Sequence, residues 1–139
     1  MRHIPHLLLE GSWSGSELEL TSAQQSHLVR VLRLEVGDPV SYTDGRGMAG
    51  SGHLGEGAIV RGPESAVERP SDLVVVAAPP ENRDRVRFMV EKLAEIGVAE
   101  LLFLDSRLGE GRPPRSDRLH AWAVAALEQS RGVMLFSFA

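Results

Sequence analysis

The chain has 139 residues, of which 42% are hydrophobic and 24% are charged, so it fits a folded globular protein of one or two domains and not a disordered or fibrous one. Cysteine is absent, which excludes disulfides, thiolate metal sites and cysteine nucleophiles. The formal net charge of −4 argues against a uniformly basic nucleic-acid binder, although fourteen of the fifteen basic residues are arginines, which suit phosphate.

The first half of the chain predicts a series of short strands joined by glycine-rich turns. Residues 17–20 alternate charged and apolar side chains with a period of two, as expected of a strand with one buried face. Asp44-Gly45 is a strong turn signal. Strands are expected over 3–9, 17–20, 39–43, 58–60 and 65–67, with a bulged hairpin over 47–57. Many short strands with glycine turns favour a small β-barrel.

One short helix, over 23–34, interrupts these strands. Thr21 or Ser22 offers it an N-cap. Three apolar residues at helical spacing are expected to form its buried face, namely Leu28, Val31 and Leu32.

The same helix carries a set of basic side chains. His27, Arg30 and Arg33 follow one another at intervals of three, so on an α-helix they share one side. Two guanidinium groups and an imidazole on one side suit contacts with RNA phosphates. The alternative is a helix face that is simply solvated.

The second half of the chain predicts a parallel α/β layer. Residues 73–78 form a continuous apolar run, typical of a strand covered on both faces. Asn82 is the expected N-cap of a helix over 83–96, and Gly97 its left-handed C-cap. This helix has an apolar stripe formed by Val86, Met89, Val90 and Leu93.

A second strand and helix follow, over 101–104 and 118–131, with Ser116 or Asp117 as the N-cap. The order β-α-β-α indicates a parallel layer, and we place the domain boundary so that residues 1–69 and 70–139 are separate domains. Because two parallel strands leave a sheet edge open, this layer is expected to be incomplete on its own.

Three stretches resemble a known family when taken in order. The first is HLVRVLR at 27–33, with Val36-Gly37-Asp38 and Asp44-Gly45-Arg46-Gly47 after it; the second is RVRFMVEKLAEIGV at 85–98; the third is ALEQSR at 126–131. They are similar to the barrel signature, the opening domain helix and a later helix end of the ribosomal RNA small-subunit methyltransferase E family.

The resemblance implies a fold and an activity. The first domain is expected to be a PUA-like RNA-binding barrel, and the second the first β-α-β-α half of a SPOUT methyltransferase domain. Members of this family use S-adenosylmethionine to methylate N3 of a uracil in 16S rRNA, and they act as homodimers. The partner implied is therefore small-subunit rRNA or the ribosomal subunit.

The resemblance also implies that a part is missing. The family's donor-binding knot, with its GPEGG motif, has no counterpart in this sequence, so no cofactor-binding residue is assigned. Leu135-Phe136 stands where the family has Leu-Pro, which favours a truncation or frameshift. Smaller departures are Ile96 in place of leucine, His6 in place of an early arginine, and Asp105-Ser106-Arg107 in place of ERS.

The candidate catalytic residues lie on the two helices of the second domain. Lys92 and Glu95 are one turn apart and share a side with Arg85, so they either face the RNA or form an ordinary surface ion pair. Gln129 and Arg131 end the last helix, where the resemblance places the active cleft. An arginine there also complements the helix dipole in any protein.

Arg107 follows the end of a strand, where ligands of open α/β sheets collect. Arg85 and Arg107 are therefore both candidate RNA contacts. The histidines are scattered and predict no metal site. No apolar stretch approaches the roughly 20 residues of a membrane span, and the three-leucine run near the start is too short for a signal peptide, so we expect a cytoplasmic protein without membrane partners.

These patterns leave three hypotheses open. The chain is the N-terminal portion of an rRNA methyltransferase and is inactive alone, or it is a non-catalytic RNA-binding module, or it is a nonfunctional fragment with an open sheet edge. Methyl transfer by the pure chain would contradict the first hypothesis, and the second predicts RNA binding that weakens as salt rises. A sharp, cooperative unfolding transition of a monodisperse sample would count against the third.

Overall fold

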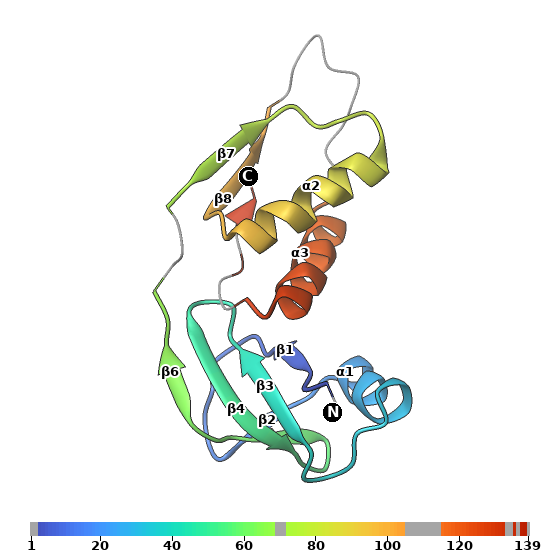
Figure 1. The fold of residues 1–139 in the computed structure, drawn as a ribbon, viewed down its shortest axis with the longest axis vertical. Helices are drawn as coiled ribbons and strands as arrows, with labels where there is room; N and C mark the ends of the chain where they lie inside the picture. Colours follow the sequence, from blue (N-terminus) through green and yellow to red (C-terminus); the bar gives the residue numbers. More distant parts are fainter. Residues whose placement is uncertain (1–2, 69–71, 105–114, 133–134, 136, 139) are drawn as a thin grey trace. The chain divides into compact units, whose positions relative to one another are not determined.

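The computed structural model of the protein describes residues 3–68, 72–104, 115–132, 135, 137 and 138. The chain divides into two units, Met1–Val67 and Glu68–Ala139, and each has a hydrophobic core of its own. Strands and helices occur together, so the predicted mixed α/β class is confirmed (Figure 1).

The first unit is built on a six-stranded sheet of short strands. These are β1 (His6–Leu8), β2 (Glu17–Glu19), β3 (Pro39–Thr43), β4 (Met48–Leu54), β5 (Ala58–Val60) and β6 (Glu64–Ala66). Their order is β1-β3-β4-β5-β2, and β6 pairs with β4 alongside this path. Within the described residues β1 and β2 end the path, so the expected barrel is not closed by strand pairing. Residues 47–57 form no hairpin of their own; β4 occupies most of them and turns into β5.

The long strand β4 depends on glycine at two positions. A Cβ atom on Gly50 would lie 2.5 Å from two ring carbons of Tyr42, which is fully buried. One on Gly52 would collide with the carbonyl oxygen of Val60 on β5. These glycines therefore let β4 pack closely against its neighbours, within the stretch predicted to be a bulged hairpin.

The predicted helix over 23–34 is shorter than expected and changes type. Helix α1 (Ser22–Ser26) begins at Thr21, whose side chain and that of Gln24 form a reciprocal capping box. A π-helical turn, η1 (His27–Val31), follows directly and closes with the Leu32 amide donating to the His27 carbonyl at 3.0 Å. The predicted N-cap is thus confirmed, but the extent of the helix is wrong.

The second unit is a three-stranded parallel sheet with two helices. Its elements are β7 (Val74–Ala77), α2 (Arg83–Ile96), β8 (Glu100–Phe103), α3 (Ser116–Ser130) and β9 (Ser137–Phe138). The strand order is β7-β8-β9, and α2 lies beside α3 (Figure 1). The expectation of only two strands is wrong, because β9 pairs with the edge of β8.

The predicted stripe of α2 forms part of the core of this unit. Val86 and Val90 are buried, and Met89 and Leu93 pack against them. Side chains of β7 alternate, so that Val75 and Ala77 join the core while Val74 and Val76 are 44% and 51% exposed. The prediction that this strand is covered on both faces is therefore wrong for the described residues.

The two helices of the second unit differ at their starts. Asn82 caps α2, because its side-chain oxygen accepts the Asp84 amide at 2.8 Å, and Gly97 ends the helix at a φ of 87°. Both features are as predicted. The N-cap of α3 is Arg115, which makes no side-chain cap hydrogen bond, so the expectation of Ser116 or Asp117 at this position is wrong.

Candidate RNA-binding and catalytic residues

The basic side chains after α1 do not form the single row that the sequence predicts. His27, Arg30 and Arg33 are all exposed. The π-helical turn is wider than an α-helical one, so residues three apart no longer lie above one another. Arg33 lies beyond the end of the turn, at a φ of 57°. Arg33 therefore lies outside the turn that carries His27 and Arg30.

The apolar face expected on this helix is wrong for a related reason. Leu28 is fully buried, but Val31 and Leu32 are 65% and 40% exposed. Only the first of the three reaches the core, because a π-helical turn changes the angular spacing between residues three and four apart.

Arg30 borders a polar hollow of about 370 Å³. The hollow is also lined by the side chains of Ser22, Gln25, Ser26 and Val29. A guanidinium beside hydroxyl and amide groups is a set that hydrogen-bonds phosphate and sugar oxygens, which position RNA without reading its bases. The surroundings of Arg30 therefore suit a contact with RNA.

The candidates on α2 are brought together. The Lys92 ammonium lies 3.2 Å from the Glu95 carboxylate, and the two side chains are 49% and 48% exposed. The ammonium also lies 5.4 Å from the ring centroid of Phe88. Arg85 is exposed one turn earlier. An exposed pair of this kind is worth at most about 1 kcal/mol, so its geometry alone does not indicate catalysis.

The candidates at the end of α3 are exposed. Gln129 belongs to the last turn, and Arg131 is the left-handed C-cap at a φ of 59°. The hydroxyl of Ser130 between them donates to the Ala126 carbonyl at 2.7 Å, as in many helix ends. Arg107 lies outside the described residues, so its predicted role stays a prediction.

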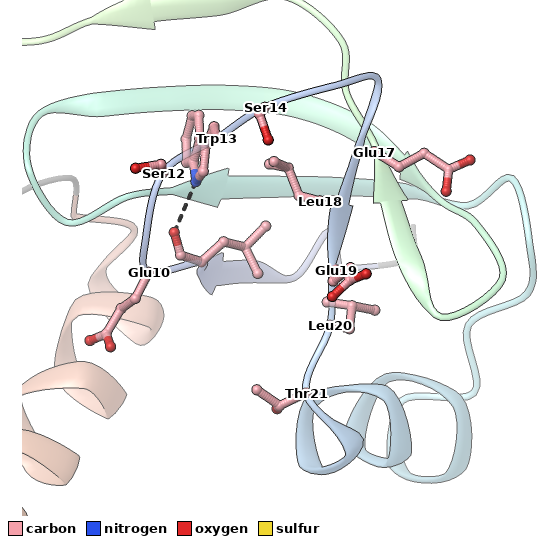
Figure 2. A pocket seen from close by; sticks show the side chains of 10 residues that line it. Glu10, Ser12, Trp13, Ser14, Glu17, Leu18, Glu19, Leu20 and Thr21 are labelled. Carbon is pink, nitrogen blue, oxygen red and sulfur yellow. Dashed lines mark hydrogen bonds between the residues drawn. The ribbon is translucent and has the colours of Figure 1, made fainter.

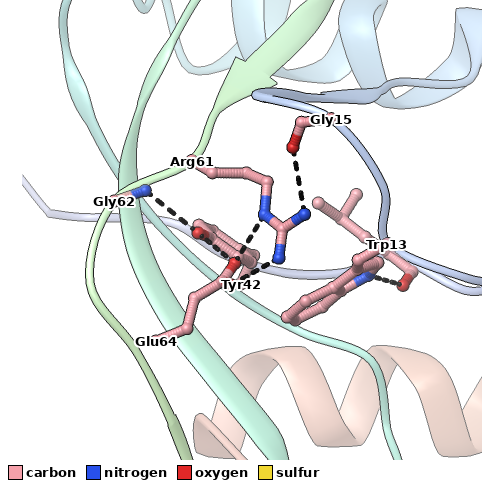
Figure 3. Close-up of polar contacts among 7 residues, drawn as sticks. Trp13, Gly15, Tyr42, Arg61, Gly62 and Glu64 are labelled. Carbon is pink, nitrogen blue, oxygen red and sulfur yellow. Dashed lines mark hydrogen bonds and ion pairs between the residues drawn. The ribbon is translucent and has the colours of Figure 1, made fainter.

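A cluster that the sequence patterns do not predict joins four side chains of the first unit (Figure 3). The Arg61 guanidinium makes a two-pronged ion pair with Glu64, at 2.6 Å and 3.0 Å. The Tyr42 hydroxyl donates to the same carboxylate at 2.8 Å and accepts the Gly62 amide at 3.2 Å. The Trp13 ring meets the Tyr42 ring edge-on at 5.2 Å between centroids.

The electrostatics of this cluster follow from its contacts. Hydrogen bonds from Arg61, and then from Tyr42, hold the pKa of Glu64 below its usual value. Burial, followed by the hydrogen bond to Glu64, raises the pKa of Tyr42. Arg61 also donates a hydrogen bond to the Gly15 carbonyl at 3.1 Å. The cluster therefore ties the start of β6 to β3 and to the loop before β2, which is a structural role.

The loop before β2 also borders a hollow of about 610 Å³ (Figure 2). Its distinctive feature is negative charge, from the carboxylates of Glu10, Glu17 and Glu19. Trp13 lies in the same wall, and its indole N–H donates to the Leu9 carbonyl at 2.9 Å. The hollow is thus acidic, with one aromatic side chain that is already hydrogen-bonded.

Neither metal ligands nor membrane spans are found in the part of the chain that the structure describes. No three of its histidine and acidic side chains gather closely enough to hold an ion. None of its helices combines the length and the apolar character needed to cross a membrane.

Comparison with known proteins assigns the second unit. A family model for an RNA methyltransferase domain matches residues 67–138, which is more than half of the chain. The chain belongs to this family. The predicted resemblance to small-subunit rRNA methyltransferases is thereby confirmed. No curated protein matches the chain.

Solved structures of similar fold cover almost the whole chain. A probable rRNA-methyltransferase from Porphyromonas gingivalis is 29% identical over 88% of the chain, with a TM-score of 0.74. A predicted RNA methyltransferase from Thermotoga maritima is 25% identical over 96%, with a TM-score of 0.78. A ribosomal RNA small subunit methyltransferase E from Neisseria gonorrhoeae, bound to S-adenosyl methionine, is 18% identical over 99%, with a TM-score of 0.79, and supports the fold alone.

These structures are longer than the present chain. The chain covers 54%, 63% and 61% of them, in the same order. Activities of the whole relatives therefore extend to this chain only as proposals.

Proposed function

We propose that this chain is the N-terminal part of an enzyme that methylates N3 of a uracil in 16S rRNA with S-adenosylmethionine, in the cytoplasm. The observation that carries the proposal is the match of the RNA methyltransferase domain to residues 67–138. The first unit is then a PUA-like RNA-binding module, and the second is the beginning of a SPOUT domain. The partner is small-subunit rRNA, and the whole enzyme is a homodimer.

The described residues provide no specific site for the methyl donor. The 610 Å³ hollow in the first unit is lined by Glu10, Glu17 and Glu19, whose charges repel the carboxylate of the donor's methionine part and attract its ammonium and sulfonium groups, so this lining does not select the donor. We therefore assign no step of methyl transfer to a residue of this chain. Lys92, Glu95, Gln129 and Arg131 remain candidates for contacts with the RNA or the uracil.

The proposal is tested by methylation of small-subunit rRNA. The 139-residue chain with labelled S-adenosylmethionine is expected to transfer no methyl group, because holding donor and acceptor together supplies much of such a rate and the donor half is not in this sequence. A fusion to the remaining part of the Thermotoga maritima relative is expected to be active. Since N3 lies on the pairing edge of uracil, its product is expected to stop primer extension at one position.

Two results would contradict the proposal. Labelling of RNA by the 139-residue chain alone would show that the donor site lies within it. A fusion that folds and binds S-adenosylmethionine but leaves N3 of every uracil unmodified would exclude the proposed specificity.

A second candidate is an RNA-binding module without chemistry. The surroundings of Arg30, with a polar hollow of about 370 Å³ beside it, favour this alternative. Like the methyltransferase proposal, this alternative predicts RNA binding that weakens as salt rises. Unlike that proposal, it predicts no methyl transfer by the fusion.

A further inference from the structure

The side of α2 that faces away from the core carries a large aromatic ring. Phe88 is 60% exposed, while Val86 and Val90 on the opposite side are almost completely buried. Single exposed apolar side chains are common and need no explanation by themselves. Phe88 differs from these because the Lys92 ammonium lies beside its ring, and Arg85 is one turn earlier on the same side of the helix.

The cations lie one turn before and one turn after the ring. Arg85, Phe88 and Lys92 are at positions i, i+3 and i+7, which places them on one side of the helix. The Lys92 ammonium is 5.4 Å from the ring centroid, within the range of a cation–π contact. A flat apolar ring flanked by positive charge matches the chemistry of an unpaired base with its phosphates.

Carboxylates on this side are largely compensated. Glu95 pairs with Lys92 at 3.2 Å, and Glu91 pairs with Arg87 at 2.9 Å. Asp84 lies in the first turn, where it faces the positive end of the helix dipole. Arg85 is exposed and has no ion-pair partner among the described residues, so on this side of the helix its charge remains available to a phosphate.

We propose that Phe88 is a stacking platform for an unpaired base of the RNA and that Arg85 contacts a neighbouring phosphate. This inference rests on the proposed function, since it is the RNA methyltransferase match over 67–138 that makes RNA the occupant. It adds a position for a single-stranded base that the proposed function does not specify.

The test measures binding of two fluorescein-labelled oligomers to the full 139-residue chain. One is an oligouridylate about ten nucleotides long, and the other is the same backbone without bases. The variants are Phe88→Ala, Phe88→Trp and Arg85→Gln, with Ile96→Ala as the control, because Ile96 is a similarly exposed apolar residue at the end of the same helix. Circular dichroism verifies the helix, which alanine favours over phenylalanine.

Phe88→Ala is expected to weaken oligouridylate binding at least about fivefold, because stacking contributes on this scale, and to leave the abasic oligomer unaffected. Phe88→Trp is expected to retain affinity, and the indole at position 88 to be quenched by oligouridylate beyond the quenching in the parent protein. Arg85→Gln is expected to weaken both oligomers, whereas Ile96→Ala is expected to weaken neither.

Equal affinity of the parent and Phe88→Ala for oligouridylate would overturn the inference while leaving the proposed function intact. Failure of the parent chain to bind either oligomer at low salt would count against both. If Phe88→Ala instead changed only the sedimentation of the protein, the ring would belong to a contact between copies of the chain and the stacking role would be wrong.

Discussion

The ion pair between Arg61 and Glu64 is the most completely satisfied polar contact described in the first unit. Both side chains are mostly covered, at 24% and 15% exposed, and both make further hydrogen bonds. Charge-assisted pairs with two parallel hydrogen bonds are stronger than single surface pairs. The stability of this unit should therefore respond to the charge state of Glu64.

The expected response is a loss of stability in acid. Because the pKa of folded Glu64 lies below the usual 4.5, the unfolded chain takes up more protons below about pH 4.5, and the free energy of unfolding falls until Glu64 itself is protonated. Glu64→Gln is expected to cost about 1–2 kcal/mol at pH 7 and to flatten this decline.

Urea unfolding between about pH 3 and pH 7 measures the effect. A Trp122→Phe background leaves Trp13, which lies in the cluster, as the fluorescent reporter. Glu56→Gln, a change at an exposed carboxylate, is the control. Parallel pH profiles for the parent and Glu64→Gln would rule out the assigned contribution.

Among the glycines of β4, Gly52 leaves the least room for a side chain. Gly52→Ala is expected to destabilise the first unit by about 1–3 kcal/mol, because the added methyl group meets backbone that cannot swing away. Ser51→Ala changes an exposed neighbour on the same strand and is expected to alter the midpoint of urea unfolding little. Equal midpoints for the two variants would contradict the close approach.

At the scale of elements, the N-terminus of α3 lacks a side-chain cap, because Arg115 makes no capping hydrogen bond. Arg115→Asp is expected to stabilise the second unit by about 0.5–2 kcal/mol, since an aspartate at the N-cap accepts a backbone N–H and complements the helix dipole. The ion pair that it removes, between Arg115 and Asp117, is highly exposed at 80% and 68% and contributes little.

Asn82→Ala is the matched change at α2, where the cap exists. It is expected to destabilise by about 1 kcal/mol, because the Asp84 amide loses its acceptor. Thermal unfolding of both variants, followed by circular dichroism, measures the two effects. Shifts of the same sign in the two variants would show that the caps do not act as described.

Elements could be predicted from the sequence where the determining signals are local. The bounds of α2 were predicted correctly because Asn82, the apolar stripe and Gly97 all lie within the helix or next to it. The π-helical turn at His27–Val31 was not predicted, since its sequence has the same apolar spacing as an α-helix. Its left-handed exit at Arg33 carries no glycine signal.

The cluster around Tyr42 shows the same limit for side chains. Arg61 and Glu64 are near in sequence, but Tyr42 reaches them only through the register of β3, β4 and β6. In that register Gly50 of β4 pairs with Tyr42 on β3 and with Glu64 on β6. No short-range sequence pattern determines this pairing. Candidate residues on one helix, such as Lys92 and Glu95, could be paired from the sequence because helical spacing is regular.

For the whole molecule, the net charge of −4 means that RNA binding depends on where the basic side chains lie and not on the total charge. We expect weak RNA binding that falls steeply with salt, and a slope of log affinity against log salt that becomes shallower by about 0.7 in Arg30→Gln, as for one lost phosphate contact to a single strand. Fluorescence anisotropy between about 50 and 200 mM salt measures both slopes. An unchanged slope would exclude Arg30 as a phosphate contact.

The acidic hollow in the first unit is expected to repel RNA from one side of that unit. Three carboxylates, those of Glu10, Glu17 and Glu19, line it, so a phosphate chain that approached from that direction would be repelled. Repulsion on one flank restricts the orientations in which a polyanion can settle, without a single favourable contact being made there. If the first unit binds RNA as proposed, the hollow would therefore reduce the number of wrong encounters and act on the association rate more than on the lifetime of the complex.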